Sequence, residues 1–301
     1  MRPGQAAGAL PLAVPAPGAA FVAERNALID RASYDTDRLT EAERETLLSA
    51  DVPAGAILLV HPTGARGLLG VRPYADRRAF RRAAPSVRRF AVAGLGGSAI
   101  GAAALARALA DFTGAPVGAV VAGYDDTDLA LEPLGGPLFF GALLRMRAAG
   151  QNARYVAQQA GAALLGAPEL APAASQRALG PASAALIELF LEPGGGVETV
   201  LAHSRGALAV EFALRRLALA GDDRAFARGL DAQIITLGTV IAPPPEVTRI
   251  SQFLGALDLF GAANSRLDAP YHSVPGALHH LNPALPGHLD TMEMLARVYP
   301  H

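Results

Sequence analysis

Short apolar runs alternate with longer Ala- and Leu-rich segments over the C-terminal two thirds of the chain. The short runs are bounded by Gly, Pro or polar residues and predict buried strands, whereas the longer segments predict helices. Strands that alternate with helices typically form a parallel sheet that is covered on both faces. The predicted strands are 56–60, 89–93, 117–121, 197–202, 234–241, 249–257 and 272–274, and the predicted helices are 99–112, 182–191, 205–220 and 289–298.

The pattern divides the chain into three parts. Residues 1–25 are rich in Ala and Pro and predict a flexible N-terminus. Residues 26–87 form an N-terminal extension, in which a polar helical pattern precedes one strand and an Arg-rich segment, 66–89, predicts a solvated face. Residues 88–301 form the α/β core. An apolar insert at about 125–175 interrupts this core. Two roles for the insert remain open: a wall or cover of the acyl pocket, or an ordinary packed helix.

Composition excludes several classes of partner. The chain has 301 residues, 51% of them hydrophobic, which suffices for one large domain or two smaller ones. A net charge of -1 provides no field that would attract nucleic acid or an anionic membrane. No apolar run is long enough and unbroken enough to predict a transmembrane helix. Prolines interrupt the apolar N-terminus, so we expect a cytoplasmic protein, with a weak signal peptide as the alternative.

Two residue types are absent from the whole sequence. There is no cysteine, which excludes a Cys nucleophile, a thiolate metal site and disulfides. There is also no lysine, so phosphate loops of the Walker type, Schiff bases and Ser-x-x-Lys acylases are excluded as well. Covalent chemistry is left to Ser, Thr, Tyr, His or a carboxylate.

The segment GLGGSA follows a predicted strand and precedes a predicted helix. Gly94, Gly96 and Ala99 match the Gly-x-Gly-x-x-Gly/Ala pattern that binds dinucleotides. Such a site needs an acidic residue about 20 positions further on, at the end of the next strand. Asp125 lies 26 residues after Ala99, so this fingerprint is weak.

A second motif, Ala-His-Ser-Arg-Gly, stands between the strand 197–202 and the helix 205–220. A nucleophile on a strand-to-helix elbow needs small residues two positions before and after it, because strand and helix approach closely there. Ala202 and Gly206 meet this requirement around Ser204. The alternative is a serine that caps an ordinary helix.

Two further residues follow their own strands. Asp258 comes after the run that ends at Gly255, and His279 lies 21 residues beyond Asp258, after the last strand. His280 is the nearest rival to His279. Asp268 and Asp231 are the rival acids. His203 is expected to form a pocket wall rather than to act as a base. His61, His272 and His288 belong to no motif and are expected at the surface or in packing. A metal bound by His279 and His280 is not expected, because no third ligand has a recognisable spacing.

The segment from Arg88 to the C-terminus resembles the α/β-hydrolase family, especially its lipase- and esterase-like members. The similarity rests on VETVLAHSRGALA, QIITLGTVIAPP, GALD, VPGALHH and GLGGSA, although Ala93 stands where the family often has His. The resemblance implies an α/β-hydrolase fold and the order Ser, Asp, His of the triad.

The implied activity is that of a serine ester hydrolase without a cofactor, acting on a small-molecule acyl ester. Ser204 would be the nucleophile, His279 the base and Asp258 the residue that orients the base. The backbone N–H groups of Leu95 and Arg205 would bind the oxyanion. The alternatives are an NAD- or NADP-dependent oxidoreductase that uses GLGGSA, and a catalytically silent hydrolase-like binding protein.

Overall fold

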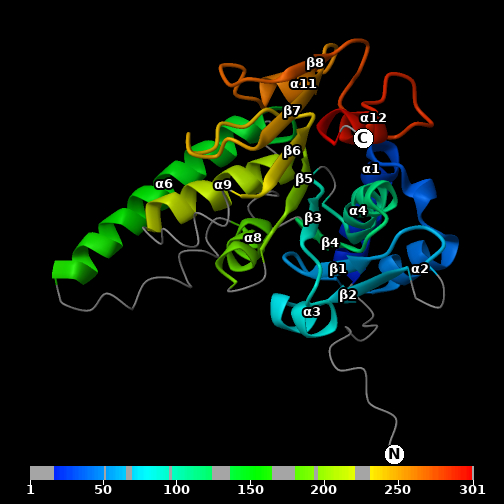
Figure 1. Ribbon diagram of the computed structural model, residues 1–301, viewed down its shortest axis with the longest axis horizontal. Helices are drawn as coiled ribbons and strands as arrows, with labels where there is room; N and C mark the ends of the chain where they lie inside the picture. Colours follow the sequence, from blue (N-terminus) through cyan, green and yellow to red (C-terminus); the bar gives the residue numbers. More distant parts are fainter. Residues whose placement is uncertain are drawn as a thin grey trace, which may run out of the picture.

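The computed structural model describes residues 17–50, 52–65, 70–94, 97–123, 136–164, 180–192, 196–220 and 231–299. In this part of the chain an eight-stranded sheet runs through the molecule, with helices on both faces (Figure 1). The strand order is β2-β1-β4-β3-β5-β6-β7-β8. The strands are β1 (Ile57–Val60), β2 (Val71–Tyr74), β3 (Arg89–Val92), β4 (Val117–Val120), β5 (Thr199–His203), β6 (Gln233–Leu237), β7 (Ile250–Gly255) and β8 (His272–Val274).

The strands from β4 to β8 pair in parallel, whereas β1 is antiparallel to both β2 and β4. The prediction of an α/β protein with a mostly parallel sheet is therefore confirmed. The helices are α1 (Pro17–Ser33), α2 (Glu41–Ser49), α3 (Arg77–Ala83), α4 (Ala99–Thr113), α6 (Gly136–Leu164), α8 (Pro181–Leu191), α9 (Arg205–Ala220), α11 (Leu259–Ala263) and α12 (Thr291–Val298), with a 3-10 turn, η1, at Thr36–Arg38.

Alternate residues of the central strands enter two separate hydrophobic clusters. In β3, Phe90 and Val92 pack with α3, α8 and α9, while Ala91 packs with α4 on the opposite face. Helices α1, α2 and α12 cover the same face as α4, and α6 joins α9 on the other (Figure 1). Because both faces are buried, the strands read as continuous apolar runs rather than as alternating ones.

The chain reverses its direction of travel across the sheet between β3 and β5. From β3 it passes through α4 to β4 on one side, and it later returns to β5 on the other side. Helices α4 and α9, which follow β3 and β5, consequently lie on opposite faces. Ligands of open α/β sheets bind at the carboxyl ends of the strands at such a switch point. The loops that begin at Gly94 and Ser204 lie there.

The N-terminal part of the chain is integral to the sheet. Residues 26–87 supply β1 and β2, so the expected boundary at residue 88 falls inside the sheet. Residues 17–25, expected to be flexible, lie in α1, whose first residue is Pro17, a favourable position for proline. Residues 1–16 lie outside the described residues.

One further expectation about local structure is corrected, and one that was left open is partly answered. The Arg-rich segment forms β2 and α3, in which Phe80 is fully buried, so a wholly solvated face is wrong. Pro73 is compatible with β2 because this strand lies at the edge of the sheet. In the insert, residues 136–164 form α6, which packs on α9. The remainder of the insert, 125–135 and 165–175, is outside the described ranges.

The sheet has shorter strands than the apolar runs suggested. Strand β6 ends at Leu237 rather than at Ile241, because Gly238 turns the backbone with a φ of 67°. The short helix α11 follows β7 directly and was not predicted. Among the helices that the structure describes, none is long and apolar enough to cross a membrane.

Candidate active site

Ser204 forms a one-residue elbow between β5 and α9. Its φ is 55°, and within the described ranges it is the sole residue other than glycine with a positive φ. A left-handed backbone costs a residue with a Cβ roughly 1–2 kcal/mol, and persists only where the surroundings impose it. Here the Ser204 N–H donates to the carbonyl of Leu237, which holds the elbow against β6. The structure thus places the predicted residue at a strained turn at the switch point.

Two glycines allow the backbones around this elbow to touch. A Cβ added to Gly206 would lie 2.0 Å from the carbonyl oxygen of Val92, the last residue of β3. A Cβ added to Gly94 would lie 2.4 Å from the amide nitrogen of Arg205. The glycine that the elbow motif requires two positions after the serine is therefore explained by contact between α9 and β3, and Gly94 is required by the approach of the loop after β3.

The side chains of Ser204, His279 and Asp258 form a continuous hydrogen-bonded chain. Ser204 Oγ lies 2.9 Å from His279 Nε2, and His279 Nδ1 lies 2.8 Å from Asp258 Oδ2. A carboxylate can only accept, so Nδ1 carries the proton and Nε2 is left to accept the hydroxyl proton of Ser204. This is the tautomer in which an imidazole can act as a base toward serine.

Asp258 is fixed by two partners. It caps the N-terminus of α11, where Oδ1 accepts from the Gly261 N–H at 2.6 Å, while Oδ2 faces His279. The residue is 2% exposed. The His279 ring is held from the side by Phe260, with ring centroids 4.6 Å apart. Ser204 is fully buried and the His279 side chain is 14% exposed, so His279 is the member of this hydrogen-bonded triad that solvent reaches.

His203, adjacent to the elbow, is fully buried and bonded at both ring nitrogens. Nδ1 lies 2.9 Å from the Tyr34 hydroxyl, and Nε2 lies 2.9 Å from the carbonyl oxygen of His279. Burial lowers the pKa of His203 well below its ordinary value, and the nearby His279 adds to this. His203 is therefore a neutral bridge between Tyr34, the residue after α1, and the loop that carries His279, not the pocket wall that was expected.

A second buried group of α1, Asp30, lies at the N-terminus of α4. Its Oδ2 accepts from the N–H and the hydroxyl of Ser98, which is the N-cap of that helix. Burial raises the pKa of Asp30 from 3.8 to about 7, although the hydrogen bonds from Ser98 oppose the shift. The loop after β3 is thus tied to α1 at its far end.

Of the two expected oxyanion donors, the structure describes only Arg205. Leu95 lies outside the described residues. Arg205 is the first residue of α9 and is half-buried, and the N–H groups of a helix's first turn point out of its N-terminus. The segment 94–98, between β3 and α4, is called the glycine loop below. The N–H of Gly94, its first residue, donates to the Tyr34 hydroxyl at 2.9 Å.

The rival residues lie apart from this chain. His280 Nε2 lies 3.2 Å from the carbonyl oxygen of Pro286, a local contact. Asp268 pairs with Arg266 at the surface, and Asp231 precedes β6 at the amino edge of the sheet. His272 stacks on Phe253, His288 faces Asp290, and His61 is half-buried next to β1. Asp125, the acid of the dinucleotide reading, is not among the described residues.

Sequence reasoning missed two residues at the end of α1 that contact the site, Asp30 in the last turns of the helix and Tyr34 directly after it. They stand four positions apart, and the Tyr34 N–H donates to the Asp30 carbonyl at 2.8 Å. Polar residues one helical turn apart were the available signal, but nothing in the sequence indicated which loop they would contact.

Comparison with protein-family models, curated proteins and solved structures gave no match for this chain.

We predict that Gly206→Ala destabilises the protein by roughly 2–4 kcal/mol, because the new methyl group would collide with the backbone of β3. The matched control is Gly150→Ala on α6, where an added Cβ meets nothing within 4 Å. That change should be neutral or stabilise by up to about 1 kcal/mol through helix propensity. Urea unfolding of both variants measures the difference, and equal stability would contradict the close approach.

A second prediction concerns the pH dependence of stability. Between pH 3.8 and about 7 the folded state keeps a proton on Asp30 that the unfolded chain has lost. This contribution is full below the lower value and is lost as the pH rises through the higher one. Relative to Asp30→Asn, the free energy of unfolding of the wild type should fall by at most about 1.4 kcal/mol per pH unit in this window. Parallel pH profiles for the two proteins would refute the shift.

Proposed function

We propose that this protein is a serine hydrolase of the α/β-hydrolase fold, which cleaves a carboxylic ester or thioester through an acyl-enzyme. The observation that supports it best is the hydrogen-bonded chain from Ser204 through His279 to Asp258, with Ser204 on a strained elbow. Serine, acid and histidine follow β5, β7 and β8 in the order typical of that fold.

In the acylation step, Ser204 Oγ attacks the acyl carbonyl carbon and His279 Nε2 takes the hydroxyl proton. The carbonyl electron pair moves to the oxygen, and His279 becomes an imidazolium that Asp258 stabilises through Nδ1–H. As the tetrahedral intermediate collapses, the alcohol or thiol leaves with the proton from Nε2. The acyl group is then bound to Ser204 as an ester.

Deacylation uses the same groups with water. His279 Nε2 takes a proton from a water molecule, whose oxygen attacks the acyl carbonyl, and returns it to Ser204 Oγ as the acid departs. The oxyanion in both steps is stabilised by backbone N–H groups of the glycine loop and of the first turn of α9, whose dipole adds to the effect.

The glycine loop fits this role better than a dinucleotide site. A pyrophosphate would need the N-terminus of α4, but the Asp30 side chain already occupies it and bonds Ser98. A second acidic group would be repelled there whenever Asp30 is ionised. The contact between Asp30 and Ser98 therefore argues against phosphate binding and favours the oxyanion role for this loop.

The surroundings of the triad favour an apolar acyl ester. Leu257 and Leu259, on either side of Asp258, are 58% and 82% exposed, and Leu278, next to His279, is 39% exposed. Exposed leucines next to residues of a site favour apolar ligands. A neutral ester with a short or medium acyl chain is the substrate class that these neighbours suit.

The first test is covalent labelling. A fluorophosphonate probe should modify Ser204, with the site identified by peptide mass spectrometry, and Ser204→Ala should abolish the label. The same variant should reduce kcat for a p-nitrophenyl ester by roughly 10⁴-fold or more while remaining folded. Ser49→Ala, an exposed serine of α2, is the control and should retain both signals. An unlabelled wild type would count equally for the silent binding protein and against this proposal.

The second test separates the adjacent histidines. His279→Ala should cost as much activity as Ser204→Ala, and the double variant should be little worse, because residues that act in one step are not additive. His280→Ala should cost about tenfold or less, since its ring bonds only a local carbonyl. Asp258→Asn should fall between these limits through loss of the required tautomer. Near-normal turnover in His279→Ala would remove the base from the mechanism.

A further inference from the structure

The C-terminal end of α1 and the residue after it, Tyr34, contact both ends of the glycine loop. Asp30 accepts from the Ser98 N–H at 2.9 Å, and Tyr34 Oη accepts from the Gly94 N–H at 2.9 Å. The Tyr34 N–H donates to the Asp30 carbonyl at 2.8 Å, so the two residues are one turn apart and are fixed relative to each other. The loop's own glycines impose little conformational restriction, and its position must come from outside it.

The Tyr34 hydroxyl also connects this loop to the base. Because a carbonyl can only accept, His203 Nε2–H donates to the carbonyl of His279, and Nδ1 is left as an acceptor. Tyr34 Oη–H then donates to Nδ1 while its oxygen accepts from Gly94. One hydroxyl, 1% exposed with its ring, thus links the backbone of the glycine loop to the backbone of His279 through a single imidazole.

The loop that carries His279 docks on the same end of α1. The Leu281 N–H donates to the carbonyl of Ser33 at 2.7 Å, and Asn282 Nδ2 donates to the carbonyl of Arg31 at 2.8 Å. Carbonyls in the last turn of a helix lack partners within the helix, so these bonds satisfy the C-terminus of α1. The glycine loop and the loop that carries His279 are therefore both held by the same end of α1.

The bridge works only with a neutral His203. The His203 and His279 rings have centroids 5.0 Å apart, and His279 becomes positively charged during the proposed reaction. A second cation at that distance would oppose the imidazolium, whereas a buried neutral ring does not. The buried position of His203 keeps it uncharged and leaves the charge to His279.

We propose that Tyr34 is a positioning residue that aligns the oxyanion loop with the catalytic base through His203. This inference rests on the hydrolase function proposed above. Tyr34 does not touch the reacting atoms; it acts through Gly94 on one side and through the His279 carbonyl on the other. Misplacement of an oxyanion donor or a base by a fraction of an ångström reduces the rate without weakening substrate binding.

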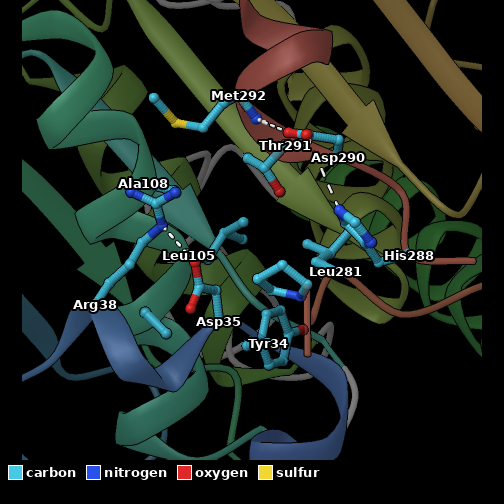
Figure 2. Close-up of a pocket in the computed structure, with 12 residues that line it drawn as sticks. Tyr34, Asp35, Arg38, Leu105, Ala108, Leu281, His288, Asp290, Thr291 and Met292 are labelled. Carbon is cyan, nitrogen blue, oxygen red and sulfur yellow. Dashed lines mark hydrogen bonds and ion pairs between the residues drawn. The ribbon is translucent and has the colours of Figure 1, made fainter. Parts of the chain in front are cut away.

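The ring of Tyr34 has a separate packing role, which allows the hydroxyl to be tested alone. The ring lines a pocket of about 120 Å³ together with Leu105, Leu281 and Met292. Figure 2 shows these side chains around the pocket. Tyr34→Phe keeps this ring and its packing and removes only the hydroxyl. The matched control is Tyr74→Phe, a buried tyrosine of β2 at the far edge of the sheet, 2% exposed.

The experiment measures kcat and KM for a p-nitrophenyl ester, together with the dissociation constant of phenylboronic acid. The boronate forms a tetrahedral anion on the serine and reports on oxyanion binding. For Tyr34→Phe we expect kcat to fall roughly 10- to 100-fold, KM to change less than about threefold, and boronate binding to weaken in step with kcat. Tyr74→Phe should leave all three unchanged at a temperature well below both melting points.

The possible results separate the two proposals. Unchanged kcat and boronate affinity in Tyr34→Phe, with a fluorophosphonate label on Ser204 in the wild type, would overturn the role of Tyr34 and leave the hydrolase standing. Equal losses of kcat and boronate affinity in Tyr34→Phe and Tyr74→Phe would indicate general destabilisation and would also overturn the proposed role of Tyr34. A wild type that neither hydrolyses the ester nor takes the label would overturn the hydrolase, and this inference with it.

Discussion

The left-handed backbone of Ser204 is the constraint on which the rest of the site depends. A residue with a Cβ adopts this conformation only when its neighbours leave no other choice. The neighbours here are β6, which accepts the Ser204 N–H, and β3, whose terminal carbonyl touches Gly206. The turn lifts the hydroxyl out of the strand direction and toward His279, and it starts α9 immediately behind the serine.

This turn stands at the topological switch point, and that location explains why so many loops converge on it. Strands β3 and β5 are neighbours, but their following helices depart to opposite faces. The start of α9 and Gly94, the first residue of the glycine loop, touch at this point. Strands β7 and β8, further along the sheet, bring Asp258 and His279 to the same edge because parallel strands share one carboxyl end.

Helix α1 shows how a segment distant in sequence completes this arrangement. It packs on α4 on one face of the sheet (Figure 1). Its residue Asp30 and the following Tyr34 bond the two ends of the glycine loop. The Tyr34 hydroxyl is bonded to Gly94 and His203. Asp30 Oδ2 accepts from Ser98, whereas Asp30 Oδ1 is buried without a hydrogen-bond partner among the residues that the structure describes. Removal of the Tyr34 hydroxyl would leave buried polar groups of Gly94 and His203 without this partner, which is costly.

The sequence by itself determined the central strands, the mostly parallel sheet and the candidate residues Ser204, Asp258 and His279. It could do so because strands buried on both faces read as uninterrupted apolar runs, and because parallel strands put the residues after them at one edge. The pattern failed where burial was one-sided or punctuated by Pro and Arg, as in β2 and α3, and in the insert that forms α6.

Tertiary structure showed that His279, the predicted base, and not its neighbour His280 faces Ser204, and it alone decided what the end of α1 contacts. His279 and His280 follow the same strand, and only the fold of their loop aims one ring at the serine and the other at Pro286. Tyr34 lies 169 residues before His203 in the chain. Local pattern reports periodicity and burial within a segment, but contacts between distant segments arise from packing, so no motif could have revealed that bridge.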